Sequence, residues 1–272
     1  MLSRRPHSPP AMTAPRAPWR WAVAGLCLGA LPALLLWAPA RWLGAAVAQA
    51  SGGQLQLQDA RGTVWTGSAR LVLTGGAGSG DQSALPGRVH WALRPAWGGA
   101  RARIAADCCT SAPLALQAQL GLGPLQVRMA DGQSQWPAGV LGGLGTPWNT
   151  VQPQGRLQLT TRGLAFEWSQ GRMQIDGQVQ LDALAMSSRM STLRPMGSYR
   201  LLLQGSAGGA APTLELSTLD GALLLSGSGQ WVGQRLRFTG EASAAPEREA
   251  ALANLLNIIG RRSGARSIIT LG

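Results

Sequence analysis

The sequence predicts a mostly β protein, in which a single N-terminal transmembrane helix precedes an antiparallel β-sandwich or curled β-sheet, with a short helix near the C-terminus. Three patterns predict this class: one uncharged apolar stretch near the N-terminus, alternating apolar and polar residues through most of the remaining chain, and one late segment with apolar residues at helical spacing. Because no helical segments alternate with the strands, a parallel α/β fold is not expected.

The apolar stretch covers residues 21–40 and carries no charged residue. A helix of this length rises about 30 Å, which matches the hydrocarbon core of a bilayer. Arginines precede the stretch, and the first acidic residue of the chain is Asp59. The positive-inside rule therefore predicts that residues 1–20 form a cytoplasmic tail and that residues 41–272 lie on the far side of the membrane.

A cleaved signal peptide is the alternative to this anchor, because Ala48-Gln49-Ala50 fits a small-residue cleavage site. The apolar stretch is longer than a typical signal core, and Arg41 and Trp42 separate it from that site. These features favour a retained anchor. Met12 is an equally good start, so no function is assigned to the residues before it.

The charge and the titratable residues point away from nucleic acid and from catalysis. The chain has 24 basic and 12 acidic residues, a net charge of +12, and every basic residue is an arginine. The arginines are scattered singly, without a basic run interleaved with aromatic residues, so nucleic-acid binding is not expected. His7 precedes the apolar stretch, and His90 lies in a predicted strand without a Gly-x-Ser-x-Gly motif. We expect no enzymatic activity and no cofactor.

The three cysteines suggest neither a metal site nor a disulfide that connects distant segments of the fold. Cys27 lies in the apolar stretch, and Cys108 and Cys109 are adjacent in the chain. Neighbouring cysteines close only a small strained ring, so a free pair or a labile disulfide is expected. Because there is no Cys-x-x-Cys pair and no set of His and Cys ligands, no metal site is expected.

Alternation with a period of two predicts strands that each bury one face. The predicted strands are separated by Gly-rich turns at spacings typical of an antiparallel sandwich, barrel or long curled sheet. They lie at residues 53–58, 87–95, 114–122, 155–168, 173–186, 197–205, 212–233 and 234–244.

Residues 247–262 predict a helix, because apolar residues recur at spacings of three and four. These residues are Ala251, Leu252, Leu255, Leu256 and Ile259. Glu247 and Glu249 lie in the predicted first turn and two arginines at the predicted end, as the helix dipole favours, and Gly260 is a suitable stop. Such a helix could cap the open end of the sheet or dock on a partner, and the final residues predict one more short strand.

Alternation lapses at residues 137–153 and, more weakly, at residues 187–200. The first lapse divides the chain into two halves, each of about 90 to 100 residues, a usual domain size. The pattern does not decide whether these halves are separate domains or one continuous sheet.

The first lapse contains the segment GTPWNT. Gly145 and Pro147 are expected to set a tight turn, and Trp148 is expected to be a large apolar anchor. Asn149 and Thr150 can satisfy local backbone groups. Packing is the default interpretation of this segment, and a partner-docking site is the alternative.

Several motifs together resemble the type II secretion system protein N family. They are GTVWTG (62–67, with Trp65), WALRP (91–95, with Trp91), LGGLGTPWNTVQPQGRLQL (141–159), LRPMGSYRL (193–201, with Pro195, Gly197 and Tyr199), LDGALLLSGSGQW (219–231), RFTGEA (237–242) and NLLNIIGRR (254–262, with Gly260). The resemblance covers nearly the whole chain after the apolar stretch, and it is weakest at residues 100–113.

This resemblance implies a non-enzymatic inner-membrane protein of Gram-negative bacteria with a periplasmic β domain. It implies a role in the machine that exports folded proteins from the periplasm through an outer-membrane secretin. The implied partners are the platform subunits, notably the L, M and C components, and the secretin. An alternative function is binding or transfer of lipid or apolar ligands, because an anchor followed by a curled sheet also resembles lipid-transfer bridges of the AsmA and lipopolysaccharide-export types.

Overall fold

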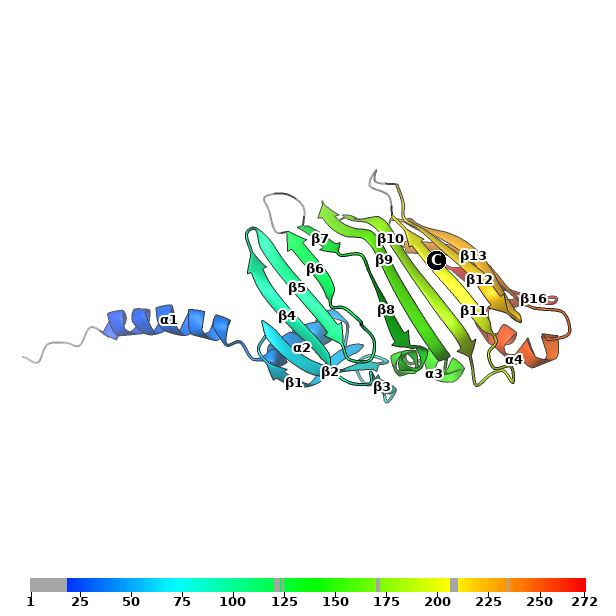
Figure 1. The fold of residues 1–272 in the computed structure, drawn as a ribbon, viewed down its shortest axis with the longest axis horizontal. Coiled ribbons are helices and arrows are strands. Elements are labelled where there is room, and N and C mark those ends of the chain that lie inside the picture. The colour runs from blue at the N-terminus through cyan, green and yellow to red at the C-terminus, as the bar shows by residue number, and fades with distance from the viewer. Residues whose placement is uncertain (1–18, 120–122, 124, 170–171, 206–209, 234) are drawn as a thin grey trace, which may run out of the picture. The chain divides into compact units, whose positions relative to one another are not determined.

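A computed structural model of the chain describes residues 19–119, 123, 125–169, 172–205, 210–233 and 235–272 (Figure 1). Contacts divide the chain into two compact units, Met1–Ala38 and Pro39–Gly272. The predicted cytoplasmic tail lies outside the described residues, except for Trp19 and Arg20, and so does Met12.

The described part of the first unit contains one helix, α1 (Trp19–Leu36). Among the described residues, no helix combines the length and the apolar character that a membrane crossing needs. The apolar stretch predicts a helix that continues to residue 40, but α1 ends at Leu36. Pro39 has an extended backbone (φ −64°, ψ 143°) and precedes a separate helix, α2 (Ala40–Ala50), because a proline inside a helix would remove a backbone hydrogen bond.

The second unit contains one open antiparallel sheet, and the described part of it has 16 strands. The sequence therefore predicts the mostly β class correctly, and the open sheet forms rather than the sandwich. The strands are β1 (Leu55–Gly62), β2 (Thr66–Thr74), β3 (Gln82–Ala84), β4 (Val89–Ala96), β5 (Gly99–Ala106), β6 (Leu114–Gln119), β7 (Leu125–Met129), β8 (Gly132–Pro137), β9 (Gln154–Ser169), β10 (Arg172–Ser187), β11 (Gly197–Gln204), β12 (Thr213–Gly221), β13 (Leu223–Val232), β14 (Arg235–Ala244), β15 (Arg261–Ser263) and β16 (Arg266–Leu271).

The strand order nearly repeats the chain order, from β1 at one edge to β16 and β15 at the other. Only β3, which pairs with β2, and β8, which pairs with β9, lie off this path. The long strand β9 joins the two halves predicted from the sequence. Its first part pairs with β8, its last part pairs with β7, and its other side pairs with β10 along most of its length, so the sheet is continuous.

The alternating residues give the sheet one apolar face and one polar face. On the apolar face, Trp91 lies opposite Ile104, and Val127 lies opposite Phe166, which in turn lies opposite Ile175. The polar face carries the intervening glutamine, serine, threonine, arginine and acidic residues. Each strand therefore buries one set of side chains, as a period of two predicts.

Three helical segments cover parts of the apolar face and form the core. These segments are α2, the 3-10 helix η1 (Ala138–Leu144) and α4 (Glu249–Ile259). Figure 1 shows α4 and the short helix α3 (Trp148–Val151) at the lower ends of the strands. Ala40 of α2 packs with Trp91, and Val140 of η1 packs with Val89. The third segment is α4, which packs in the largest of the three clusters. Its buried residues are Met196, Tyr199, Leu223, Ala242, Leu252, Leu255 and Leu256.

Helix α4 buries Leu252, Leu255 and Leu256 as their spacing predicts. It covers part of the apolar face and packs within the fold. The helix ends at Ile259, directly before Gly260, as predicted, and Gly260 has an extended backbone. The two arginines expected in the last turn begin β15 instead. The Ser267 hydroxyl on β16 donates a hydrogen bond to the Leu256 carbonyl (2.5 Å), which satisfies one of the carbonyl groups left free where the helix ends.

An ion pair joins β10 and β11 on the polar face. Arg200 donates to both carboxylate oxygens of Asp182 (2.7 and 2.9 Å), and Gln180 donates a third hydrogen bond (2.8 Å). The hydrogen bond from Arg200 holds the pKa of Asp182 below its ordinary value, although burial opposes the shift. This contribution to stability is therefore present above the unfolded-state pKa of aspartate, about 3.9, and is lost as the pH falls through the lower folded-state pKa.

Cys108 and Cys109 form a disulfide with each other in the turn after β5. Of the two states left open by the sequence, the structure contains the bonded one. Cys109 is 5% exposed and packs with Val89 and Val140, whereas Cys108 is exposed. The pair constrains one local turn and connects no distant segments.

Candidate functional site

The GTPWNT segment lies between β8 and β9, where two short helices interrupt the sheet. Gly145 ends η1 with φ 79°, a left-handed conformation that glycine adopts without strain. The Thr146–Pro147 peptide bond is cis, and α3 begins at Trp148. The segment thus turns the chain from η1 into α3, as expected from its glycine and proline.

A side-chain hydrogen bond connects α3 to the N-terminal half of the sheet. The Asn149 amide nitrogen donates to Asp81 Oδ2 (2.9 Å), just before β3. Nearby, a Cβ added to Gly145 would lie 3.4 Å from the Gly75 Cα atom, so the two backbones pass close together. The Asn149 side chain also accepts a hydrogen bond from the Thr150 hydroxyl (3.2 Å). It therefore binds both a residue of its own turn and the distant residue Asp81.

Three further hydrogen bonds connect the end of α3 to the β10–β11 connection in the C-terminal half. The Val151 carbonyl accepts one from the Ser188 hydroxyl (2.6 Å) and one from the Arg189 backbone nitrogen (3.3 Å). The Arg189 guanidinium donates to the Gln152 side chain (3.2 Å). The two lapses in strand alternation thus meet in space, and the short helix is attached to both halves.

Helix α3 is partly exposed. None of its residues is buried, and the Trp148 side chain is 40% exposed. Beside it lies an open polar hollow of about 480 Å³, to which Asp81 and Asn149 contribute. Of the α3 residues, Asn149 lines this hollow and Trp148 does not. A partly exposed aromatic side chain on a helix held from two sides is suited to contact another protein. We refer to residues 146–150 and this hollow as the α3 surface.

The other residues singled out from the sequence differ in burial: Trp91, Gly197 and Tyr199 are buried, Trp65 and Gly260 are half-buried, and Pro195 is exposed. The Trp91 indole nitrogen donates to the Thr63 and Val64 carbonyls (3.2 and 3.0 Å), and the Trp65 carbonyl accepts a hydrogen bond from the Leu93 backbone nitrogen (2.6 Å). These contacts fix the β1–β2 turn against β4. The two tryptophan motifs therefore meet at one end of the sheet.

The motif at residues 193–201, which contains Pro195, Gly197 and Tyr199, contributes to the α4 cluster. Gly197 leaves space for the Tyr199 ring, because a Cβ added at Gly197 would lie 2.7 Å from the Tyr199 hydroxyl. The Tyr199 side chain is 7% exposed, and burial raises the pKa of its hydroxyl well above its ordinary value. Its hydroxyl has no hydrogen-bond partner in the described part of the chain. This motif and Gly260 thus lie around α4.

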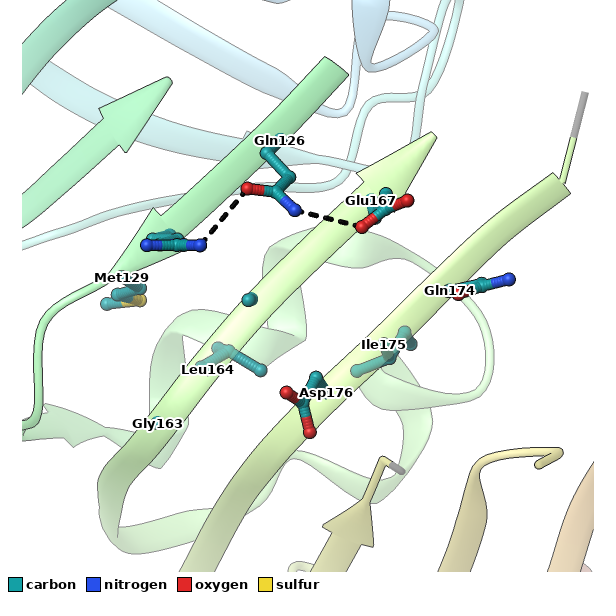
Figure 2. Close-up of a pocket in the computed structure, with 10 residues that line it drawn as sticks. Gln126, Met129, Gly163, Leu164, Glu167, Gln174, Ile175 and Asp176 are labelled. Atoms are coloured by element: carbon teal, nitrogen blue, oxygen red, sulfur yellow. Dashed lines mark hydrogen bonds between the residues drawn. The ribbon is translucent and has the colours of Figure 1, made fainter. Parts of the chain in front are cut away.

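A second hollow, of about 350 Å³, lies on the polar face between β7, β9 and β10 (Figure 2). The Gln126 amide donates to Glu167 Oε2 (2.9 Å), and its carbonyl oxygen accepts a hydrogen bond from Arg128 (3.2 Å). The sequence patterns did not single out these residues, because they occupy ordinary polar positions of three different strands.

Neither hollow brings together the groups of a recognisable catalytic site. His90 and Asp107 interact (3.1 Å), but no serine or cysteine hydroxyl or thiol is bonded to His90 within the described residues. In the same part of the chain no three metal-ligating side chains gather. The described groups with a shifted pKa are Asp182, Tyr199 and Arg200, and all three serve the fold.

Comparisons with known proteins give one match. The family model described as "Type II secretion system (T2SS), protein N" matches residues 53–269. Searches of curated proteins and of solved structures found no significant match. The matched range begins just before β1 and ends within β16, so it contains both motifs of the α3 and α4 regions.

Proposed function

Since the chain belongs to the type II secretion system protein N family, we propose that it is a non-enzymatic inner-membrane component that supports export of folded proteins across the outer membrane. It acts through contacts between its β domain (41–272) and the platform subunits, namely the L, M and C components, or the secretin. The family match over most of the second unit carries this proposal.

The α3 surface is the contact that we propose for a platform subunit. Tryptophan is enriched among the residues that dominate binding energy at protein interfaces. Hydrogen bonds to Asp81 and Ser188 hold α3 in place before any partner binds, so little conformational entropy is lost on association. An exposed tryptophan on a fixed support meets both requirements of a docking site.

Trp148→Ala is expected to abolish secretion while the protein stays folded and abundant. Truncation of an interface tryptophan costs about 2 kcal/mol or more, which is roughly a 30-fold loss of affinity. The measurement is the amount of a secreted enzyme in the medium and in the periplasm, together with copurification of the platform subunits. Trp97→Ala is the matched control, because Trp97 is 106% exposed in the β4–β5 turn, and it should secrete normally.

Two outcomes would count against docking at α3. A Trp148→Ala protein that is degraded or unfolds early would indicate a packing role. A folded variant that secretes and copurifies like the wild type would show that Trp148 is not in the interface.

We further propose that residues 21–40 anchor the chain in the inner membrane, with the N-terminus in the cytoplasm and the β domain in the periplasm. The uncharged stretch and the arginines before it support this orientation. A phosphatase that is active only in the periplasm is expected to be active when fused after Gly272. If this fusion is inactive and a reporter that works only in the cytoplasm is active at the same position, the orientation is the reverse of the one proposed. Release of the protein by washing the membranes would indicate cleavage.

Binding of lipid or another apolar ligand is a second candidate, favoured by the part of the apolar face that the helices leave open. Leu125 and Trp168 lie opposite each other and are 37% and 40% exposed. Phe166 stacks against Trp168 with ring centroids 6.0 Å apart. Lipid that copurifies with the protein and is lost in Trp168→Ser would support this function, whereas a lipid-free protein that still secretes would refute it.

A further inference from the structure

A row of arginines crosses the polar face of the N-terminal half. Arg94 on β4 lies opposite Arg101 on β5, Arg101 lies opposite Gln117 on β6, and Gln117 lies opposite Arg128 on β7. Neighbouring strands are about 4.8 Å apart, so these side chains line up across four strands. Arg103 lies two residues from Arg101 on the same face. We call Arg94, Arg101, Arg103 and Arg128 the arginine row, and all four are exposed.

The arginine row is not neutralised by the fold. The ion pairs of the described residues involve other basic groups, namely Arg70, His90, Arg200 and Arg266. Arg128 has a hydrogen bond to Gln126, an uncharged group. Like charges directly opposite each other on neighbouring strands destabilise a sheet. The folded protein therefore retains an electrostatic cost here that an anionic partner would relieve.

The row ends at the polar-face hollow shown in Figure 2. Arg128 lies opposite Ala165 on β9, and Ala165 lies opposite Asp176 on β10. The small side chain of Ala165 leaves the hollow open, and the carboxylates of Glu167 and Asp176 border it. Along this line the charge thus changes from positive at the arginine row to negative at Glu167 on β9 and Asp176 on β10.

We propose that this face binds an acidic segment of a partner protein that lies across the strands. The partner's carboxylates meet the arginine row, and a basic side chain that follows them enters the hollow beside Glu167 and Asp176. Arginine suits this role because its guanidinium forms paired hydrogen bonds with a carboxylate. An anionic membrane surface has one sign of charge and would be repelled at the hollow, whereas a polypeptide carries both signs in order.

This inference rests on the proposed function only in taking a protein as the partner. The test uses the full chain in non-ionic detergent and a fluorescent glutamate-rich peptide that ends in lysines, with binding followed by anisotropy at low salt. The variant Arg94→Gln, Arg101→Gln, Arg103→Gln, Arg128→Gln should lose roughly tenfold or more in affinity. The matched control removes the same charge elsewhere, at Arg235, Arg237, Arg261 and Arg262, and should bind nearly as well as wild type.

A second variant tests the change from positive to negative charge along the face. The double variant Glu167→Gln, Asp176→Asn should bind the lysine-ended peptide more weakly than wild type and should bind a peptide without lysines as wild type does. Because the row variant removes repulsion, its Tm at low salt should equal or exceed that of wild type, which also shows that it folds. Equal losses in the row variant and its matched control would reduce the effect to net charge and overturn the proposal.

Vesicles with anionic lipid provide the remaining outcome. Vesicle binding that depends on the arginine row, with no binding of the peptide, would replace the protein partner by a membrane surface and overturn the proposal. The assay contains no secretion machinery, so its failure would leave the role in secretion untouched.

Discussion

Tyr199→Ala is expected to destabilise the protein by about 3–5 kcal/mol, because it removes a large ring from the α4 cluster and leaves a cavity. Tyr199→Phe, in contrast, should leave stability unchanged or raise it by about 1 kcal/mol. The Tyr199 hydroxyl is buried without a hydrogen-bond partner in the described residues, so its removal relieves a desolvation cost and breaks no contact. Thermal unfolding of both variants measures the difference, at about 2–4 °C per kcal/mol.

Hydrogen exchange should locate the effect of the alanine variant. The Tyr199 ring packs with Leu252, Leu255 and Leu256, so α4 and β11 to β14 should exchange faster while β1 to β4 change little. If Tyr199→Phe were as unstable as Tyr199→Ala, the hydroxyl would have an essential partner and the unpaired state would be wrong.

Trp91→Ala is expected to cost about 3–5 kcal/mol at the opposite end of the sheet, with a Tm lower by about 6–20 °C. Trp91 is 5% exposed and packs with Ala40 of α2 and with Ala69. Its removal leaves a cavity under α2 and also frees the Thr63 and Val64 carbonyls from the indole nitrogen.

Trp91→Phe separates these two losses, since it keeps most of the apolar contact and removes the hydrogen bonds. It should cost less than the alanine variant. Trp97→Ala is the control for loss of an indole, because the exposed Trp97 side chain should contribute within about 0.5 kcal/mol. A Trp91→Ala protein as stable as this control would mean that α2 does not depend on the contact.

The long strands could be predicted from the sequence, but several short ones could not. Strands β9, β10 and β14 alternate large apolar residues with polar ones, which is the pattern typical of a strand with one buried face. Strand β5 was missed because Ala100 and Ala102 supply its apolar positions beside Ile104, and alanine is too small to mark a buried face. Strand β8 has only six residues and borders the lapse in alternation.

The candidate site was predicted as a segment but not as an arrangement. Glycine and proline in GTPWNT indicated a turn, since both act on the backbone near them. The partners of the turn are remote: Asp81 is 68 positions from Asn149, and Ser188 is 37 positions from Val151. Nothing in a single sequence links such positions. The arginine row was missed for the same reason, because strand register decides which arginines face each other.

The neighbour-to-neighbour strand order also affects how the chain can fold. Except for β15, which pairs with the strand that follows it, every strand after β1 on the path pairs with the strand before it or with the one before that. Contacts of short sequence separation lose little loop entropy and form early. If the chain folds from its N-terminus, most strands can pair with the edge strand of a sheet that has already formed. Helix α4 comes late, and its cluster also needs β11, β13 and β14, so the C-terminal core should be the last part of the sheet to become stable.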